Sequence, residues 1–229
     1  MCVRVAFRTD ASLQIGTGHV MRCLTLADAL REQGAECQFV CREHEGNLIK
    51  HIRSRGYEAH ALPTPNTNTS FKSDLAHASW LGVDWLTDAQ ETLQFIAETK
   101  LDWLVLDHYA LDHRWESALR SSCKRIMVID DLADRQHDCD LLLDQNYGSS
   151  EERYLSLVPA DCAQCHGPEH ALLKPAYAER CAQLPARHEQ VRRVLIYFGG
   201  GADAVNLTGF VVQVFQVPEL AHIELDIVV

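Results

Sequence analysis

The chain has 229 residues, of which 47% are hydrophobic, so it can bury a core as one large domain or as one and a half ordinary ones. Its formal net charge is −11 and its 21 Lys and Arg residues form no long run, which argues against binding to nucleic acid or to a membrane surface. The N-terminal sequence lacks the apolar core of a signal peptide and no stretch is as long as a membrane span, so we expect a cytoplasmic protein. Its nine cysteines are scattered, and we expect most of them to be reduced.

Short apolar runs alternate with amphipathic segments from the N-terminus onward, which is the pattern of parallel strands joined by helices. The run VRVAF predicts a strand at 3–7, and the spacing of apolar residues predicts a helix from Gly18 to Gln33. In chain order, the sequence then predicts a strand at 36–41, a helix at 47–56 and a strand at 57–62. The stretch at 63–74 is rich in Pro, Asn, Thr and Ser, and we expect a mobile loop there.

The same alternation continues through the middle of the chain. It predicts a helix from about Asp84 to Thr99, a strand at 102–109, a helix near 112–123, and strands at 125–130 and 140–146. Two of these strands contain the nearly unbroken apolar runs WLVL and IMVI, which are typical of central strands in a sheet covered on both faces. The predicted fold class is therefore α/β, with a Rossmann-like, doubly wound parallel sheet.

The C-terminal part of the chain predicts a second α/β unit. The stretch QLPARHEQ (183–190) has the composition of a linker, and RRVLIYFGGGADAVNLTGFVVQVF after it repeats a strand, a glycine loop and a helix. We therefore assign 1–185 to an N-terminal Rossmann-like domain and 191–229 to the start of a second, nucleotide-binding one. Because 191–229 supply only two strands and one helix, we expect this second domain to be incomplete.

Polar residues follow the carboxyl ends of the predicted strands, which is where open parallel sheets bind ligands. They are Thr9 and Asp10 after the first strand, Asp107, His108 and Tyr109 after the fourth, Asp130 and Asp131 after the fifth, and Gln145, Asn146 and Tyr147 after the sixth. Strand ends meet polar turns in many folds, but convergence on one edge favours a binding site.

A histidine follows a short glycine loop at the start of the first predicted helix. The sequence GTGHVM contains Gly16 and Gly18 but lacks the third glycine of the dinucleotide-binding pattern, so it predicts no nicotinamide cofactor. Small residues let backbone amides approach a ligand, and the positive end of a helix suits a phosphate. That positive end disfavours an imidazolium, so we expect His19 to be neutral and able to accept a proton from water. A histidine that only caps or packs at a helix start fits the spacing too.

The stretch CAQCH at 162–166 matches the C-x-x-C-H pattern of covalent haem attachment, but that chemistry needs export and no signal peptide is seen. Cys162, Cys165 and His166, with His170, are an alternative set of metal ligands, but a second ligand pair at suitable spacing is missing. We therefore predict no haem, no metal and no other cofactor.

Several stretches, in order over nearly the whole chain, resemble one family. They are QIGTGHVMRCLTLA, VLDHYALD, IDDLADRQHDCDLLLDQN, GPEHALLKPAYAE and FGGGAD, of which the first is the most specific. They resemble the UDP-2,4-diacetamido-2,4,6-trideoxy-β-L-altropyranose hydrolases of pseudaminic acid biosynthesis. The resemblance implies a two-domain glycosyltransferase-B architecture and a metal-independent hydrolysis in which water attacks the anomeric carbon and UDP leaves. It implies that His19 is the base for that water and that SWLGVD (79–84) belongs to a mobile flap.

The same resemblance implies which residues surround the substrate. It places Asp10, Asp107, His108, Tyr109 and Asn146 around the sugar. From the chemistry of glycine loops at helix starts, we also expect Gly16 and Gly18 at the substrate and Gly199, Gly200 and Gly201 at the diphosphate. The chain has His170 where the family leads us to expect a tyrosine. The implied partner is a UDP-sugar, and we expect a monomer.

Two other functions fit the sequence. A glycosyltransferase of the same architecture would use an acceptor other than water, because a fold does not fix a reaction. An inactive, truncated module would bind sugar without turnover, and the unfinished second domain favours this alternative. If the chain ends at Val229, we do not expect efficient hydrolysis.

Overall fold

The computed structural model describes residues 2–65, 74–96, 100–184, 190–198 and 204–228. Contacts between residues divide the chain into two compact units. The first comprises Met1–Ser12 and Thr17–Leu173, and the second comprises Leu13–Gly16 and Lys174–Val229. Helix α5 (Pro175–Gln183), which the sequence analysis assigned to the first domain, is therefore grouped with the second unit.

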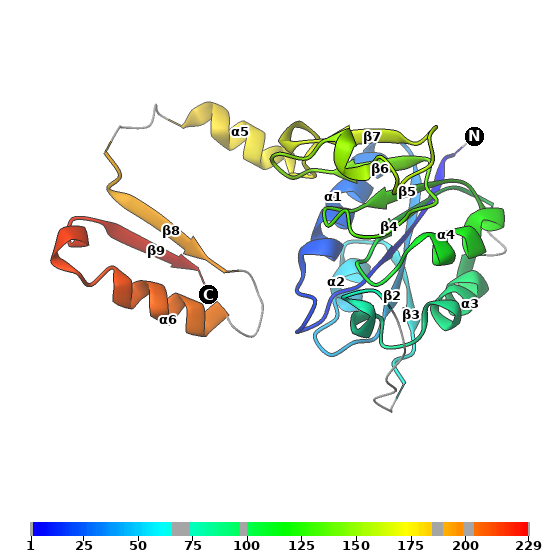
Figure 1. Cartoon of the computed structure of the whole chain (residues 1–229), viewed down its shortest axis with the longest axis horizontal. Helices are drawn as coiled ribbons and strands as arrows, with labels where there is room; N and C mark the ends of the chain where they lie inside the picture. The colour runs from blue at the N-terminus through cyan, green and yellow to red at the C-terminus, as the bar shows by residue number, and fades with distance from the viewer. Residues whose placement is uncertain (1, 66–73, 97–99, 185–189, 199–203, 229) are drawn as a thin grey trace. The chain divides into compact units, whose positions relative to one another are not determined.

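The first unit contains a seven-stranded parallel sheet with the strand order β3-β2-β1-β4-β5-β6-β7 (Figure 1). The strands are β1 (Arg4–Thr9), β2 (Glu36–Arg42), β3 (Glu58–Leu62), β4 (Leu101–Asp107), β5 (Cys123–Ile129), β6 (Leu141–Asp144) and β7 (Ala163–His166). The order reverses between β1 and β4, and open sheets bind ligands beyond the carboxyl ends of the strands at such a switch point. The predicted α/β fold is confirmed, and six of these strands lie within a few residues of their predicted positions.

Helices cover both faces of this sheet. On one face lie α1 (Gly18–Glu32) and α2 (Ile49–Ser54), which pack on Val5, Phe7 and the other strand residues whose side chains point to that face. On the opposite face lie α3 (Trp85–Ile96) and α4 (His113–Leu119), which pack on Ala6 and the other strand residues whose side chains point to this second face. Alternate residues of each strand thus enter two separate cores, because successive side chains point to opposite faces. None of the helices in the described residues is long and apolar enough to cross a membrane.

Short 3-10 helices complete the first unit. They are η1 (Ala78–Leu81), η2 (Arg120–Ser122), η3 (Glu151–Tyr154) and η4 (Pro168–His170). The predicted helix near 112–123 ends early because η2 and then β5 take its last residues. Most of the predicted loop at 63–74 and the end of the helix predicted at 84–99 lie outside the described residues.

A buried group of charged side chains lies under α3 and α4. Asp88 of α3 accepts hydrogen bonds from Arg8 Nε (3.0 Å) and Nη2 (2.6 Å), from Arg42 Nη2 (2.7 Å) and from Trp115 Nε1 (3.0 Å). The side chains of Arg8, Arg42 and Asp88 are fully buried. Burial alone would raise the pKa of Asp88, but the two guanidinium groups outweigh it and lower that pKa. Two strands and two helices are therefore joined through one ionised carboxylate.

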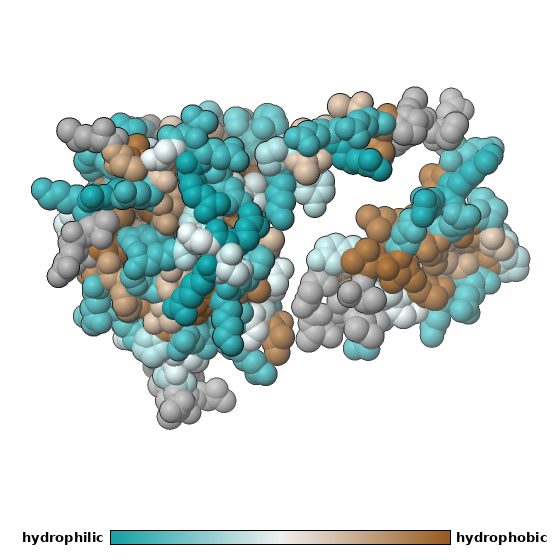
Figure 2. All heavy atoms as spheres, turned by 180° about the vertical axis from the view of Figure 1, so that it is seen from behind, coloured by the Kyte–Doolittle hydropathy of each residue, from teal (hydrophilic) through white to brown (hydrophobic). Residues whose placement is uncertain are grey.

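The second unit contains two parallel strands, β8 (Arg193–Tyr197) and β9 (Glu224–Val228), connected by α6 (Ala204–Val214) and η5 (Pro218–Leu220). This matches the strand, helix and strand predicted for 191–229. Ile196 is buried, whereas Leu195 and Tyr197 on the opposite face of β8 are exposed. Figure 2 shows apolar side chains gathered on the surface of this unit.

Candidate active site

His19 lies in the first turn of α1, next to the carboxyl end of β4. Its Nδ1 atom is 2.6 Å from Oδ1 of Asp107, and the imidazole is 9% exposed while the carboxylate is fully buried. An ionised carboxylate can only accept, so Nδ1 carries the hydrogen and Nε2 is the ring nitrogen that can accept a proton. A histidine base oriented by a carboxylate has this arrangement in many hydrolases.

Arg22, three residues after His19 on the same face of α1, binds the same carboxylate. Its Nε lies 2.6 Å from Oδ2 of Asp107, and its Nη2 lies 2.6 Å from Oδ1. Burial alone would raise the pKa of Asp107, but the charges and hydrogen bonds of His19 and Arg22 hold that pKa well below its usual range. Asp107 is therefore ionised and fixed in orientation at any ordinary pH.

Arg22 was not predicted from the sequence, although its spacing from His19 is a signal for a shared helix face. The charged surroundings of His19 were not predicted either. The sequence pointed only to the helix dipole, whereas the structure also places Oδ1 of Asp107 2.6 Å and Nη2 of Arg22 3.3 Å from Nδ1 of His19.

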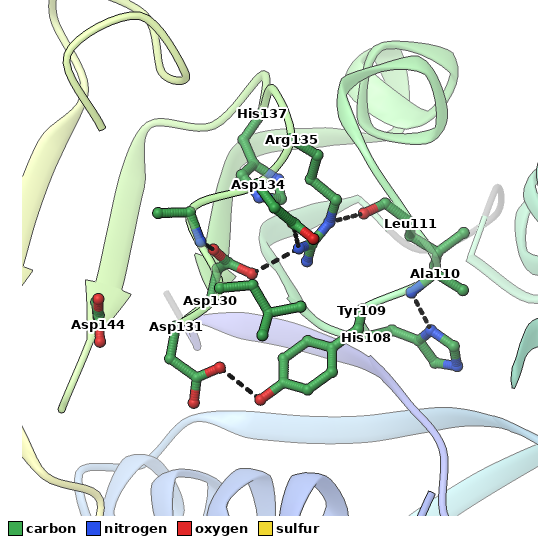
Figure 3. Close-up of polar contacts among 12 residues, drawn as sticks. His108, Tyr109, Ala110, Leu111, Asp130, Asp131, Asp134, Arg135, His137 and Asp144 are labelled. Atoms are coloured by element: carbon green, nitrogen blue, oxygen red, sulfur yellow. Dashed lines mark hydrogen bonds and ion pairs between the residues drawn. The ribbon is translucent and has the colours of Figure 1, made fainter. Parts of the chain in front are cut away.

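Tyr109 packs edge-on against His19, with ring centroids 4.6 Å apart and planes at 84°. Its hydroxyl donates a hydrogen bond of 2.5 Å to Oδ1 of Asp131 (Figure 3). Burial and this bond raise the pKa of Tyr109 well above its usual value, so the hydroxyl remains protonated. The rings of His77 and Trp80 lie 5.5 Å and 5.8 Å from that of Tyr109. The structure therefore brings part of the 79–84 segment next to the site.

Replacing Tyr109 with phenylalanine is expected to lower the free energy of unfolding by about 0.5–1.5 kcal/mol, because one hydrogen bond to Asp131 is lost while the ring contact with His19 remains. Urea unfolding of the two proteins measures the change. Tyr109→Ala, which also removes the ring, is expected to cost more; an equal loss for both variants would contradict the role given to the ring.

Asp10 and His108 form a second pair at the same edge of the sheet, and the carboxylate of Asp10 is engaged within the protein. Asp10 is fully buried and accepts from Arg8 Nη1 (2.7 Å) and Nη2 (2.9 Å) and from the backbone N–H of Arg42 (2.6 Å). Burial would raise the pKa of Asp10, but Arg8 in particular lowers it well below its usual value. Asp10 thus holds together the ends of β1 and β2.

His108 is nearly buried beside Asp10. Its Nδ1 accepts a hydrogen bond of 3.1 Å from the N–H of Ala110 (Figure 3), and burial lowers its pKa. Its Nε2 is 3.1 Å from Oδ2 of Asp10, and within the described residues this nitrogen has no partner in hydrogen-bond geometry. His108 is therefore a neutral ring that shapes the end of β4.

Carboxylates at the carboxyl ends of β5 and β6 are also held by neighbouring side chains. Arg135 Nη1 lies 2.8 Å from Oδ1 of Asp130, as Figure 3 shows, and the Tyr154 hydroxyl lies 3.2 Å from Oδ2 of Asp130 and 3.1 Å from Oδ2 of Asp144. Arg153 Nη1 binds the same oxygen of Asp144 at 2.6 Å. These contacts fix the edge of the sheet beside Asp131. In the part of the chain that the structure describes, no three His, Cys, Asp or Glu side chains converge on a metal position.

Three further sets of residues were predicted for the site. Gly16 has φ of +80°, a conformation that favours glycine, and a Cβ at Gly18 would meet nothing within 4 Å, which leaves the start of α1 open. Asn146 follows β6 and is exposed, and no contact between its side chain and His19 or Asp107 is seen among the described residues. Gly199, Gly200 and Gly201 lie outside the described residues.

Comparison with solved structures gives the class of fold. MurG of Acinetobacter baumannii has a TM-score of 0.53 and 12% identity, with 99% of this chain and 67% of that chain covered. UGT89C1 of Arabidopsis thaliana, complexed with quercetin, has a TM-score of 0.59 and 10% identity, with 100% and 70% covered. The chain has the Rossmann-like fold of glycosyltransferase-B type that the sequence predicts.

Comparison with curated sequences supports the resemblance that the motifs indicate. The chain is 28% identical over 207 residues to the UDP-2,4-diacetamido-2,4,6-trideoxy-β-L-altropyranose hydrolase of Campylobacter jejuni, with 90% of this chain covered. It is 22% identical over 210 residues to an uncharacterized protein of Methanocaldococcus jannaschii. This similarity supports the family that the motifs predict. It spans 63% of the length of that hydrolase and 38% of the archaeal protein, and no protein-family model matches it.

Proposed function

We propose that this chain carries the catalytic histidine of a nucleotide-sugar hydrolase that releases UDP from UDP-2,4-diacetamido-2,4,6-trideoxy-β-L-altropyranose. The observation that carries the proposal is the bond of 2.6 Å between Nδ1 of His19 and the buried carboxylate of Asp107, at the switch point of a parallel sheet. Similarity to the Campylobacter hydrolase supports a substrate of the nucleotide-sugar class.

In the proposed reaction, Nε2 of His19 takes a proton from water as the water oxygen attacks the anomeric carbon. The bond from that carbon to the diphosphate oxygen breaks, and UDP leaves with the bonding electrons. Asp107 keeps the acceptor lone pair on Nε2 and stabilises the imidazolium that forms, and Arg22 holds Asp107 in place. No metal is required in this scheme. We further propose that 191–229 begin the domain that binds the nucleotide, with the loop at Gly199, Gly200 and Gly201 at the diphosphate.

The replacement Asp107→Asn tests this scheme. An amide can present its N–H to Nδ1 and stabilise the wrong tautomer of His19, so we expect kcat for UDP release, measured with EDTA present, to fall by about 10²–10⁴-fold. Asp102→Asn is the matched control, because Asp102 lies on the same strand at its opposite end and binds Lys124 and the N–H of Arg4. Equal activity of the Asp107 variant and the wild type would overturn the assignment, and activity that EDTA abolishes would overturn metal independence.

A glycosyltransferase is the second candidate function, because MurG and UGT89C1 have similar folds. A base oriented by a carboxylate can deprotonate an acceptor hydroxyl as well as water. UDP release that requires an added acceptor would favour the transferase. If calorimetry shows sugar-nucleotide binding but neither water nor any acceptor supports release, the chain is a binding module.

A further inference from the structure

The two cysteines of the CAQCH stretch do not form one site. This stretch includes the edge strand β7, and its alternate residues face opposite sides of the sheet. Cys162 packs against the core under α3 and α4, whereas Cys165 packs against the core under α1 and α2. A haem or metal site built from both thiols is therefore inconsistent with the fold, and Cys162 has a different neighbour.

That neighbour is Cys139, which precedes β6. The Sγ atoms of Cys139 and Cys162 are 3.5 Å apart. The backbone fixes this approach, since the N–H of Ala163 donates to the carbonyl of Asp140 at 2.9 Å and β6 pairs with β7 in parallel register from Leu141 and Ala163 onward. A small side-chain movement without a change of strand register would bring the sulfur atoms to bonding distance.

We propose that Cys139 and Cys162 are a thiol-oxidation site, at which a low-molecular-weight disulfide such as oxidised glutathione converts the two thiols to an intrachain disulfide. The Cys162 thiolate attacks one sulfur of the oxidant, which forms a mixed disulfide and releases one glutathione thiolate. The Cys139 thiolate then attacks Cys162 Sγ, which releases the second glutathione thiolate. The protein loses two protons and two electrons, and the oxidant is reduced to two thiols.

The order of these steps follows from the unequal settings of the two thiols. Cys162 is partly exposed, whereas Cys139 is 2% exposed. The hydrogen bond between them lowers the pKa of Cys162 and, with burial, raises that of Cys139. The accessible thiol is therefore the more acidic one, as expected for an attacking cysteine with a buried resolving partner.

Oxidation would tie together both ends of a segment that lies beside the candidate active site. The segment between the two cysteines contains β6 and the side chains of Asp144, Arg153 and Tyr154, and Tyr154 also binds Asp130. Closing it with a covalent bond reduces the conformational freedom of the unfolded chain. We therefore expect the oxidised protein to have a higher Tm than the reduced one.

Peptide mapping after treatment of the native protein with oxidised glutathione tests the proposal. The expected product is a peptide that joins Cys139 to Cys162, has lost two hydrogen atoms and is cleaved by dithiothreitol. The exposed thiols of Cys2 and Cys181 report, through their glutathione adducts, that the oxidant was active. Cys165→Ser is the matched control and is expected to form the same cross-link.

Two variants separate the steps. Cys139→Ser is expected to stop at a glutathione adduct on Cys162, and Cys162→Ser is expected to leave Cys139 unmodified in the folded protein. Full modification of Cys2 and Cys181 in the wild type without a 139–162 cross-link would overturn the proposal, as would an equal yield of a 162–165 cross-link. This result does not depend on UDP release, so the oxidation site and the proposed function can fail separately.

Discussion

Replacing His19 with glutamine is expected to lower kcat for UDP release by about 10²–10⁴-fold, because the variant loses the only group proposed to take the proton from water. KM is expected to change little, since His19 acts on the water and its ring contacts Asp107 and Tyr109 within the protein. Initial rates of UDP release with EDTA present, at several substrate concentrations, separate the two constants.

The matched control is His60→Gln. His60 lies on β3 and stacks on Phe95, away from the ends of β1 and β4, so the same change of side chain should leave kcat intact. A rate for His19→Gln within a factor of two or three of the wild type would contradict the role of base. In that case His19 would be a packing residue at the start of α1, the alternative that the sequence left open.

The second large effect concerns stability. Asp88→Asn is expected to lower the free energy of unfolding by about 3–5 kcal/mol, because the change removes the negative charge that Arg8 and Arg42 share in a fully buried position. Denaturant unfolding followed by circular dichroism measures the loss. Asp161→Asn, a change at an exposed carboxylate, should have little effect. Comparable stability of the two variants would show that the charged group contributes little.

Acid unfolding provides an independent test of the same carboxylate. The pKa of Asp88 is lowered in the folded protein, so at acidic pH the unfolded chain binds the proton more readily. The stabilisation that Asp88 contributes is therefore complete above about pH 4, the pKa of an unperturbed aspartate, and is lost as the pH falls through the folded pKa. Asp88→Asn lacks this contribution, so its stability should fall less steeply with acid than that of the wild type.

The order of strands and helices in the first unit was predictable because apolar runs and glycine stops mark them plainly. Strand β7 was missed because AQCH contains no apolar run and a four-residue edge strand needs little apolar surface. The early end of α4 was missed because the turn at Arg120 is fixed by contacts with Asp138 and Asp140, which come from a later part of the chain.

The candidate site was predicted in part. Proximity of His19, Asp107 and Tyr109 follows from parallel strands that end at one edge, and the structure places the three together. The specific pairing of His19 with Asp107 could not be predicted, because it depends on how α1 packs over β4. For the same reason the sequence could not show that the carboxylate of Asp10 is occupied by Arg8.

The buried charges that join β1 and β2 to α3 lie on one face of the sheet, and the pair of His19 and Asp107 lies on the other, beneath α1. Substitutions under α3 and α4 can therefore be screened for thermal tolerance while the proposed proton-transfer residues keep their surroundings. Directed evolution of this scaffold can therefore vary two nearly separate regions, one that governs thermal stability and one that holds the proposed proton-transfer residues.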